Sequence, residues 1–240
     1  MTANILILTG AGISAESGLG TFRDAGGLWE KFDWRKLATP EAFAEDTQLV
    51  HAFYNARRQA MADASPNAAH YALAEAETLW RGHGQGDFLL VTQNIDDLHE
   101  KAGSERLIHM HGELLKSRCA ACGALARHAD DLSVEHACQS CNAAAAMRPH
   151  VVWFGEMPLE LDRVYAALEV CDLFVAIGTS GTVYPAAGFV EEARRVGAWT
   201  VELSLEPGAV SALFDERVYG PATEIVPNWA EQAKQRFAAD

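Results

Sequence analysis

Several features that would place this chain in a special class are missing. No apolar stretch approaches membrane-spanning length, and residues 1–8 lack the basic start and the long apolar segment of a secretion signal. Basic residues are scarce: 19 Lys and Arg stand against 33 Asp and Glu, and the net charge is -14. This balance argues against general nucleic-acid binding and favours cationic partners. We expect a cytoplasmic monomer that binds neither membranes nor nucleic acids.

Cysteine is also scarce, and its distribution is uneven. Four of the five cysteines form the pattern Cys119-x2-Cys122-x15-Cys138-x2-Cys141. Two thiolate pairs at this spacing are typical of a tetrahedral zinc ribbon, and four thiolates leave no open position for water. The pattern predicts one structural zinc ion per chain; an empty or disulfide-bonded cluster is the alternative. Cys171 lies outside the cluster and is interpreted as a small buried residue.

Short apolar runs alternate with longer helix-like segments, which is typical of a parallel sheet covered by helices. The predicted buried strands are Ile5 to Leu8, Phe88 to Thr92, Leu173 to Ile177 and Thr200 to Leu203. Helices are predicted over residues 40–58 and 67–80. The fold class is therefore α/β, with a doubly wound parallel sheet and a smaller inserted part.

A glycine-rich block follows the first predicted strand. Residues 10–15, Gly-Ala-Gly-Ile-Ser-Ala, fit the G-x-G-x-x-G/A form of a dinucleotide-binding turn, whose glycines let the backbone approach a pyrophosphate near a helix N-terminus. A glycine turn without a ligand is the alternative. A dehydrogenase would also carry an acidic residue at the end of its second strand. Glu30 has the spacing but lies in a loop rich in glycine and aromatic residues, so hydride transfer is disfavoured.

Five blocks in the same order along the chain resemble the sirtuin family. They are GAGISAESGLGTFR at 10–23, TQNIDDLH at 92–99, HMHGE at 109–113, GTS at 178–180 and YGPA at 219–222. The resemblance implies an NAD-dependent protein-lysine deacylase that releases nicotinamide and forms O-acyl-ADP-ribose from acylated-lysine proteins. It also implies a Rossmann-like large domain, at 1–23, 87–111 and 150–240. The small domain would combine a helical module at 24–86 with the zinc ribbon at 112–149.

The same resemblance implies an NAD site and a catalytic group. The cofactor-binding residues would be Gly10, Ala11, Gly12, Ala15, Thr21, Phe22, Arg23, Gln93, Asn94, Ile95, Asp96, Gly178, Thr179, Ser180, Ser204, Leu205, Glu206 and Ala222. Asn94 and Asp96 would hold nicotinamide and ribose in a reactive pose, and Phe22 would exclude water. His111 would be the general base, since only histidine has an ordinary pKa near neutrality. His109 would point to the opposite face and is interpreted as structural.

A possible acyl pocket is carried by Tyr54 and Arg57, three residues apart on a predicted helix. An ordinary packing tyrosine and a solvated arginine are the alternative. The pair resembles the Tyr-x-x-Arg of class III sirtuins, which grips the carboxylate of succinyl, malonyl or glutaryl groups, and the small Ala38 also resembles that class. Residues 150–156, with Val152, Phe154 and Gly155, resemble the family's substrate-peptide strand; a plain edge strand is the alternative.

Two positions depart from the family pattern, and two other functions stay open. Ser204 stands where relatives often carry Asn, and Gly20 adds flexibility to the cofactor loop. An NAD-dependent protein ADP-ribosyltransferase would use the same glycosidic cleavage without needing His111 in the same way. A non-enzymatic NAD-sensing module with a zinc ribbon would leave Asn94, Asp96 and His111 unexplained.

Overall fold

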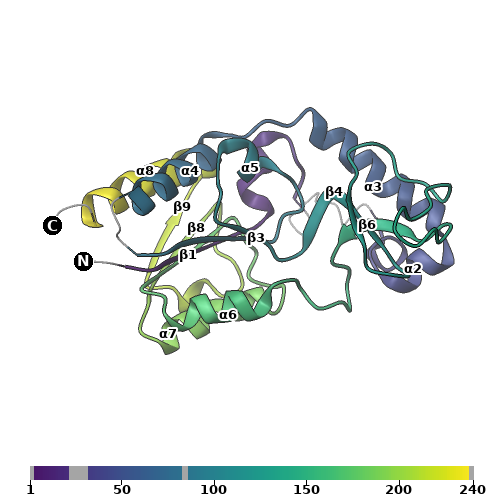
Figure 1. Ribbon diagram of the computed structural model, residues 1–240. Helices are drawn as coiled ribbons and strands as arrows, with labels where there is room; N and C mark the ends of the chain where they lie inside the picture. Colours follow the sequence, from purple (N-terminus) through teal and green to yellow (C-terminus); the bar gives the residue numbers. More distant parts are fainter. Residues whose placement is uncertain (1–2, 22–31, 83–85, 238–240) are drawn as a thin grey trace.

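The computed structural model describes residues 3–21, 32–82 and 86–237 (Figure 1). Within these residues the larger sheet has six strands, all paired in parallel, in the order β3-β2-β1-β7-β8-β9. The strands are β1 (Ile5–Thr9), β2 (Phe88–Thr92), β3 (Leu107–His109), β7 (Leu173–Ile177), β8 (Trp199–Ser204) and β9 (Glu216–Tyr219).

The strand order reverses direction between β1 and β7. From β1 the chain moves outward to β2 and β3, and it then returns beside β1 to build β7, β8 and β9 on the other side. In open α/β sheets the crevice for a ligand lies at such a switch point, outside the carboxyl ends of the strands. Here these ends are followed by Gly10 and Gly178, so the glycine-rich block lies at the switch point.

Helices cover both faces of this sheet because its strands are apolar on both faces. Ile5 and Ile7 join one core cluster with α4 (Ala68–Gly82) and α8 (Ala222–Phe237). Leu6 and Leu8 join the opposite cluster with α6 (Leu161–Glu169) and α7 (Phe189–Arg195). Figure 1 shows the two helix pairs on opposite sides of the sheet. The predicted doubly wound α/β fold is confirmed.

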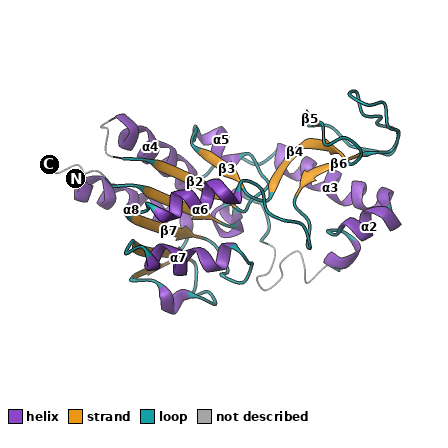
Figure 2. Ribbon diagram, turned by 60° about the horizontal axis from the view of Figure 1, so that its bottom comes forward, coloured by secondary structure: helices purple, strands orange, loops and turns teal. Residues whose placement is uncertain are grey.

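A smaller part lies beside the carboxyl ends of the large sheet (Figure 2). It contains an antiparallel sheet in the order β5-β4-β6 and two helices. Its elements are α2 (Pro40–Glu45), α3 (Thr47–Ala62), β4 (Gly112–Cys119), β5 (Leu125–Arg127) and β6 (Met147–Val151). Val50, Tyr54, Leu114 and Trp153 belong to a core cluster of their own between the helices and this sheet.

Short helices complete the described structure: α5 (Leu98–Ala102), η1 (Ala11–Ile13), η2 (Ala15–Ser17), η3 (Trp34–Lys36), η4 (Ala186–Gly188) and η5 (Ser211–Leu213). Residues 11–17, which overlap the glycine-rich block, therefore form two turns of 3-10 helix at the place where the sequence motif indicated a helix N-terminus.

Two other sequence expectations need correction. The helix predicted over 40–58 is split, because the Asp46 carboxylate accepts the Leu49 N–H at 2.9 Å and so caps a new helix. The strand predicted over 150–156 ends at Val151. Beyond it, the Glu156 N–H donates to the Trp153 carbonyl at 3.0 Å and closes a turn.

The division into two domains stays a prediction, and α4 bears on its boundary. This helix belongs to the segment 24–86 that the sequence assigned to the small part, yet its buried residues pack with α8 on the large sheet. We propose that α4 be counted with the large domain. Among the described residues, none of the helices combines the length and the apolar character needed to span a bilayer.

Candidate active site

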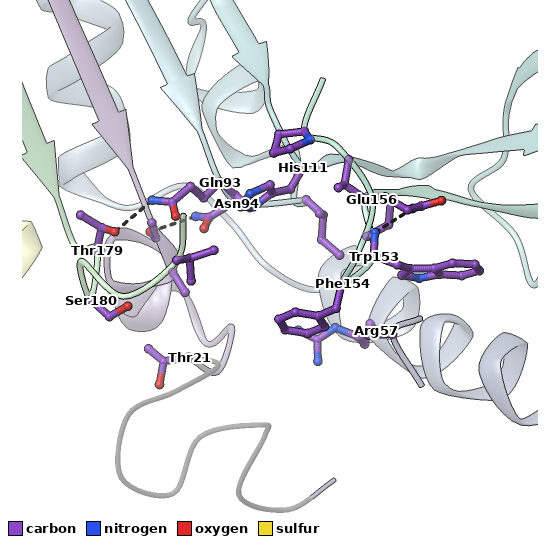
Figure 3. Close-up of a pocket in the computed structure, with 18 of the residues that line it drawn as sticks. Thr21, Arg57, Gln93, Asn94, His111, Trp153, Phe154, Glu156, Thr179 and Ser180 are labelled. Carbon is purple, nitrogen blue, oxygen red and sulfur yellow. Dashed lines mark hydrogen bonds between the residues drawn. The ribbon is translucent and has the colours of Figure 1, made fainter. Parts of the chain in front are cut away.

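A cavity of about 250 Å³ opens between the large sheet and the smaller part (Figure 3). Its lining includes these predicted site residues: Gly10, Ala11, Gly12, Thr21, Ala38, Tyr54, Arg57, Gln93, Asn94, Ile95, His111, Val152, Phe154, Gly155, Gly178, Thr179 and Ser180. In Figure 3, Gln93, Asn94 and Thr179 lie on one side, and Arg57, Trp153 and Phe154 lie on the other. The predicted cofactor and acyl residues therefore share one cavity.

The floor of the cavity is backbone, because the two glycine turns touch. The Gly12 N–H donates to the Gly178 carbonyl at 2.9 Å, and the Gly10 N–H donates to the Ile177 carbonyl at 2.9 Å. A Cβ on Gly12 would lie 2.7 Å from the Gly178 Cα, and one on Gly178 would lie 2.5 Å from the Ile13 nitrogen. Only glycine fits at these positions, which leaves bare backbone at the switch point where a phosphate-bearing ligand can approach closely.

Asn94 and Asp96 are held in place by Ser14 of the glycine-rich block. The Asn94 amide donates to the Gly10 carbonyl and to the Ser14 hydroxyl, both at 3.1 Å. The Ser14 hydroxyl in turn donates to Asp96 at 3.1 Å. Burial raises the pKa of Asp96, and the hydrogen bonds from Leu98 N–H and Ser14 oppose that rise. The two polar side chains thus lie at fixed positions in a site that is largely closed to water.

A smaller cavity of about 40 Å³ adjoins the first one, and Asp96 lines it together with Ser14, Gly20 and Leu114. Asn94 and Arg57 line both cavities. The predicted nicotinamide residues and the predicted acyl residue Arg57 are therefore neighbours. Their charges also interact, since Asp96 is among the groups that favour the charged form of Arg57.

His111 projects into the cavity with a defined tautomer in its neutral form. Its Nδ1 lies 3.0 Å from the Gln93 carbonyl oxygen, which can only accept a hydrogen bond. The proton of the neutral ring therefore sits on Nδ1, and Nε2 keeps its lone pair. Burial lowers the pKa of His111, while the Gln93 carbonyl partly opposes this effect. The ring is neutral near pH 7, as a general base must be.

His109 makes different contacts from His111. Its Nδ1 lies 3.2 Å from the Asn94 carbonyl, and its Nε2 lies 2.7 Å from the Glu100 carboxylate. The side chain supports the backbone of Asn94 and is outside the cavity lining, in keeping with the structural role predicted for it. Glu100, His109 and Glu113 are close enough to share a metal ion, but Glu113 is paired with Lys116 and Glu100 with His109.

Tyr54 and Arg57 project from α3 into the same cavity because they are three residues apart on the helix. The Arg57 guanidinium lies 5.5 Å from the centre of the Phe53 ring. Burial lowers the pKa of Arg57, which the nearby Tyr54 and Asp96 partly restore. Ala38 is buried beside them, and its carbonyl accepts the Phe154 N–H at 2.9 Å. Arg57 is half-buried in the cavity lining, and the acyl-binding role of the pair stays a prediction.

Several predicted cofactor residues lie outside the cavity lining. Ser204 is the last residue of β8, Leu205 and Glu206 follow it, Ala222 begins α8, and Ala15 is exposed at the end of the glycine-rich block. Phe22 and Arg23 fall outside the described residues. Ser14 and Trp153 are lining or supporting residues that the sequence prediction omitted. Ser14 belongs to the glycine-rich motif and could have been noted there; Trp153 had no signal beyond its place in the segment 150–156.

The four clustered cysteines bring their sulfurs together at the end of the smaller part. All four Sγ atoms lie within 4.8 Å of one another, with Cys119 to Cys141 at 3.8 Å and Cys122 to Cys138 at 3.7 Å. A disulfide needs about 2.05 Å. In a tetrahedral site with zinc–sulfur bonds of about 2.3 Å, neighbouring sulfurs lie about 3.8 Å apart. The donor set and its spacing therefore fit a closed, structural zinc site.

Comparisons with known proteins agree with this geometry. The Sir2 family profile matches residues 10–185. A Caulobacter vibrioides NAD-dependent protein deacylase is 56% identical over 233 residues, 97% of this chain and 98% of that protein. An Escherichia coli K12 protein with the same name is 56% identical over 231 residues, 95% of this chain and 81% of that protein.

Solved structures give the same result. A Sir2 homologue bound to ADP-ribose matches with a TM-score of 0.90 at 35% identity, covering 99% of this chain and 95% of the other. A Sir2 homologue in complex with NAD matches with a TM-score of 0.87 at 36% identity, covering 98% and 91%. The extent of these matches confirms the resemblance found in the sequence: the chain belongs to the Sir2 family, the sirtuins.

Proposed function

We propose that this sirtuin is an NAD-dependent protein-lysine deacylase that removes succinyl, malonyl or glutaryl groups in preference to acetyl. The deacylase names of relatives that are 56% identical support the general activity. The acyl preference rests on one observation, which is that Tyr54 and Arg57 share a cavity with His111 and Asn94. A carboxylate on the acyl chain would meet a phenol and a guanidinium in a partly buried pocket.

The residues at the switch point fit NAD as the co-substrate. Gly10, Gly12 and Gly178 leave no space for a Cβ, so bare backbone would face the pyrophosphate. Asn94 and Asp96 would hold the nicotinamide and its ribose, because both are fixed through Ser14 and line the smaller cavity. Cleavage of the glycosidic bond passes through a cationic ribose, so orientation and exclusion of water matter more than a strong acid.

His111 would act after nicotinamide has left. In the proposed order of steps, the acyl carbonyl oxygen first bonds to the ribose carbon. The neutral Nε2 of His111 then takes a proton from a ribose hydroxyl. The resulting oxygen attacks the acyl carbon and closes a ring on the ribose, and His111 returns its proton to the lysine nitrogen, which leaves as the free amine. A water molecule then adds to the acyl carbon and one ring C–O bond breaks, so the products are free lysine and O-acyl-ADP-ribose. The Gln93 carbonyl would stabilise the protonated ring, because it accepts the Nδ1–H at 3.0 Å throughout.

The zinc site takes no part in these steps. Cys119, Cys122, Cys138 and Cys141 would hold one ion with no open position, at the end of the smaller sheet. When bound there, zinc would cross-link the strand ends and the loop between them. It would not act as a Lewis acid on the substrate. The monomeric state and the cytoplasmic location expected from the sequence remain predictions.

The direct test compares removal of succinyl and acetyl from one lysine peptide. We expect the native protein to favour succinyl in kcat/KM, and Tyr54→Phe and Arg57→Met to remove most of that preference. A lost bond to a buried charge costs about 1.5–3 kcal/mol, so each variant should lose about ten- to a hundredfold on succinyl. His111→Tyr should lose activity on both substrates.

Arg163→Met provides the matched control. Arg163 lies on the exposed surface of α6 with 66% of its side chain accessible, so this variant removes a guanidinium without touching the cavity. The acyl preference should not change. A native protein that favours acetyl, with no effect of the two pocket variants, would refute the proposed specificity. Transfer of labelled ADP-ribose onto protein in place of peptide deacylation would favour the transferase alternative.

A further inference from the structure

The phenol of Tyr54 has a single hydrogen-bond partner in the described part of the chain. The Trp153 indole Nε1–H donates to the Tyr54 oxygen at 2.9 Å. An indole N–H can only donate, so the phenol oxygen must be the acceptor in this bond. Its own O–H proton lies in the ring plane, and the position on the Trp153 side is already taken. The proton is therefore turned to the other side of the oxygen.

No protein group in the described residues accepts that proton. Arg57, which lines the same cavity, carries only donors, and the oxygens of Glu156, another lining residue, already accept from Arg148 and the Trp153 backbone N–H. Tyr54 is 3% exposed, and burial raises its pKa to about 12, while the hydrogen bond from Trp153 opposes the rise. The phenol stays protonated at physiological pH. The pocket thus presents an oriented O–H beside a guanidinium, and a carboxylate can accept hydrogen bonds from both.

Trp153 can orient Tyr54 because the indole is itself held on several sides. The Arg148 guanidinium carbon lies 3.3 Å from the centre of the indole ring, and the Phe43 ring packs at 5.3 Å. The Trp153 backbone N–H donates to Glu156 at 2.8 Å. Arg148 binds both oxygens of Glu156, at 2.6 and 2.9 Å, so the cation above the indole is also fixed.

We propose that Trp153 is a specificity-determining residue, which orients the Tyr54 hydroxyl as a hydrogen-bond donor to the carboxylate of an acidic acyl group. This inference rests on the proposed deacylase function and deepens it. Without the indole N–H the phenol proton could turn toward the freed lone-pair direction, and binding an acyl carboxylate would have to reorder it. An acetyl group ends in a methyl and gains nothing from the oriented proton.

The test is a double-mutant cycle on the ratio of succinyl to acetyl kcat/KM. Trp153→Phe keeps an aromatic ring beneath Arg148 and removes only the N–H donor and part of the ring. Trp153 also lines the cavity, so its replacement can change both activities. The readout is therefore the ratio of the succinyl to the acetyl kcat/KM, and not either value by itself. We expect the ratio to fall about three- to tenfold in the native background and less than about twofold in the Tyr54→Phe background, where no hydroxyl remains to be oriented.

A second readout follows the hydrogen bond itself. The indole N–H resonance of Trp153, identified as the signal missing from Trp153→Phe among the six tryptophans, should move upfield in Tyr54→Phe. Arg163→Met should leave it unchanged.

The outcomes separate the two proposals. A native protein without succinyl preference refutes the proposed function and the specificity role together. A native preference that Trp153→Phe leaves intact, or a loss of equal size in both backgrounds, refutes the role of Trp153 alone. If the chemical shift of the Trp153 indole N–H does not change in Tyr54→Phe, the hydrogen bond on which the role depends is refuted.

Discussion

Replacing Gly178 by Ala should damage both stability and cofactor binding, by an amount that follows from its position. Gly178 has φ +59°, a left-handed conformation that costs an alanine about 1–2 kcal/mol. The new Cβ would also lie 2.5 Å from the Ile13 nitrogen and 2.7 Å from the Gly12 carbonyl carbon. Overpacking of this kind costs about 1–3 kcal/mol. We expect the free energy of unfolding in urea to fall by about 2–5 kcal/mol.

The same substitution should raise the KM for NAD. Relief of the clash has to move the glycine-rich block, in which the Gly10 carbonyl and the Ser14 hydroxyl accept hydrogen bonds from the Asn94 amide. We expect KM for NAD to rise at least about tenfold, measured with a saturating acyl peptide.

Gly20→Ala is the control for this prediction. Gly20 has an ordinary φ, and no described atom lies within 4 Å of the position of its Cβ. Stability should change by less than about 1 kcal/mol, and toward a more stable protein, because alanine restricts the unfolded chain. If Gly178→Ala kept the native stability and the native KM for NAD, the close approach of the two turns would not be needed and the argument would be wrong.

Three further predictions concern protonation, zinc and a buried histidine. Burial lowers the pKa of His111, so deacylase kcat/KM should be constant above that pKa and fall tenfold per pH unit below it. The midpoint of this fall should lie under pH 6.5, and a midpoint above pH 7 would contradict the assigned environment of His111. Metal analysis should give about one zinc per chain, lost in Cys122→Ser and kept in Cys171→Ser. Both nitrogens of buried His51 lack partners among the described residues, so His51→Leu should stabilise the fold by about 1–2 kcal/mol at pH 7.5. The folded-state pKa of His51 is about 4, mainly through burial, against 6.5 when unfolded; the native protein therefore loses stability as pH falls from 6.5 toward 4, and the gain in urea denaturation should be larger at pH 5.

The large sheet could be predicted from sequence because its central strands are buried on both faces. Residues 5–8 and 173–177 are continuous apolar runs, and 88–91 are apolar before Thr92; residues 200–203 are less clear, because Glu202 interrupts them. Each of the four segments proved to be a strand. The edge strands β3 and β9 were missed. They have only three and four residues, and β9 alternates half-buried and exposed positions, so neither carries a continuous apolar signal.

The polar part of the site was predictable only where a motif marks it. The glycine-rich block, Asn94, Asp96, His111 and the cysteine cluster have fixed local spacings, and the structure brings each group together. The bond between Trp153 and Tyr54 joins residues 99 positions apart in the chain. No periodicity or spacing links such a pair, since it depends on how β6 packs against α3.

His111 lies where the two parts of the molecule meet, and this position fits its proposed role, in which one residue serves both substrates. β3 of the large sheet ends at His109, and β4 of the smaller sheet begins at Gly112, so this connection between the two sheets consists of Met110 and His111. The His111 ring is tied to the large part through the Gln93 carbonyl, and its backbone carbonyl accepts the Val152 N–H of the smaller part at 2.8 Å.

The sharp turn beside His111 fixes that junction. Gly112 has φ +84°, and a Cβ there would lie 2.1 Å from the His150 carbonyl oxygen, so β4 and β6 approach as closely as only glycine permits. The predicted NAD residues lie mainly on the large part and the acyl residues Tyr54 and Arg57 on the smaller one. A general base that must reach a ribose hydroxyl beside an acyl carbon has to be anchored to both parts, and the short connection between the two sheets provides that anchor.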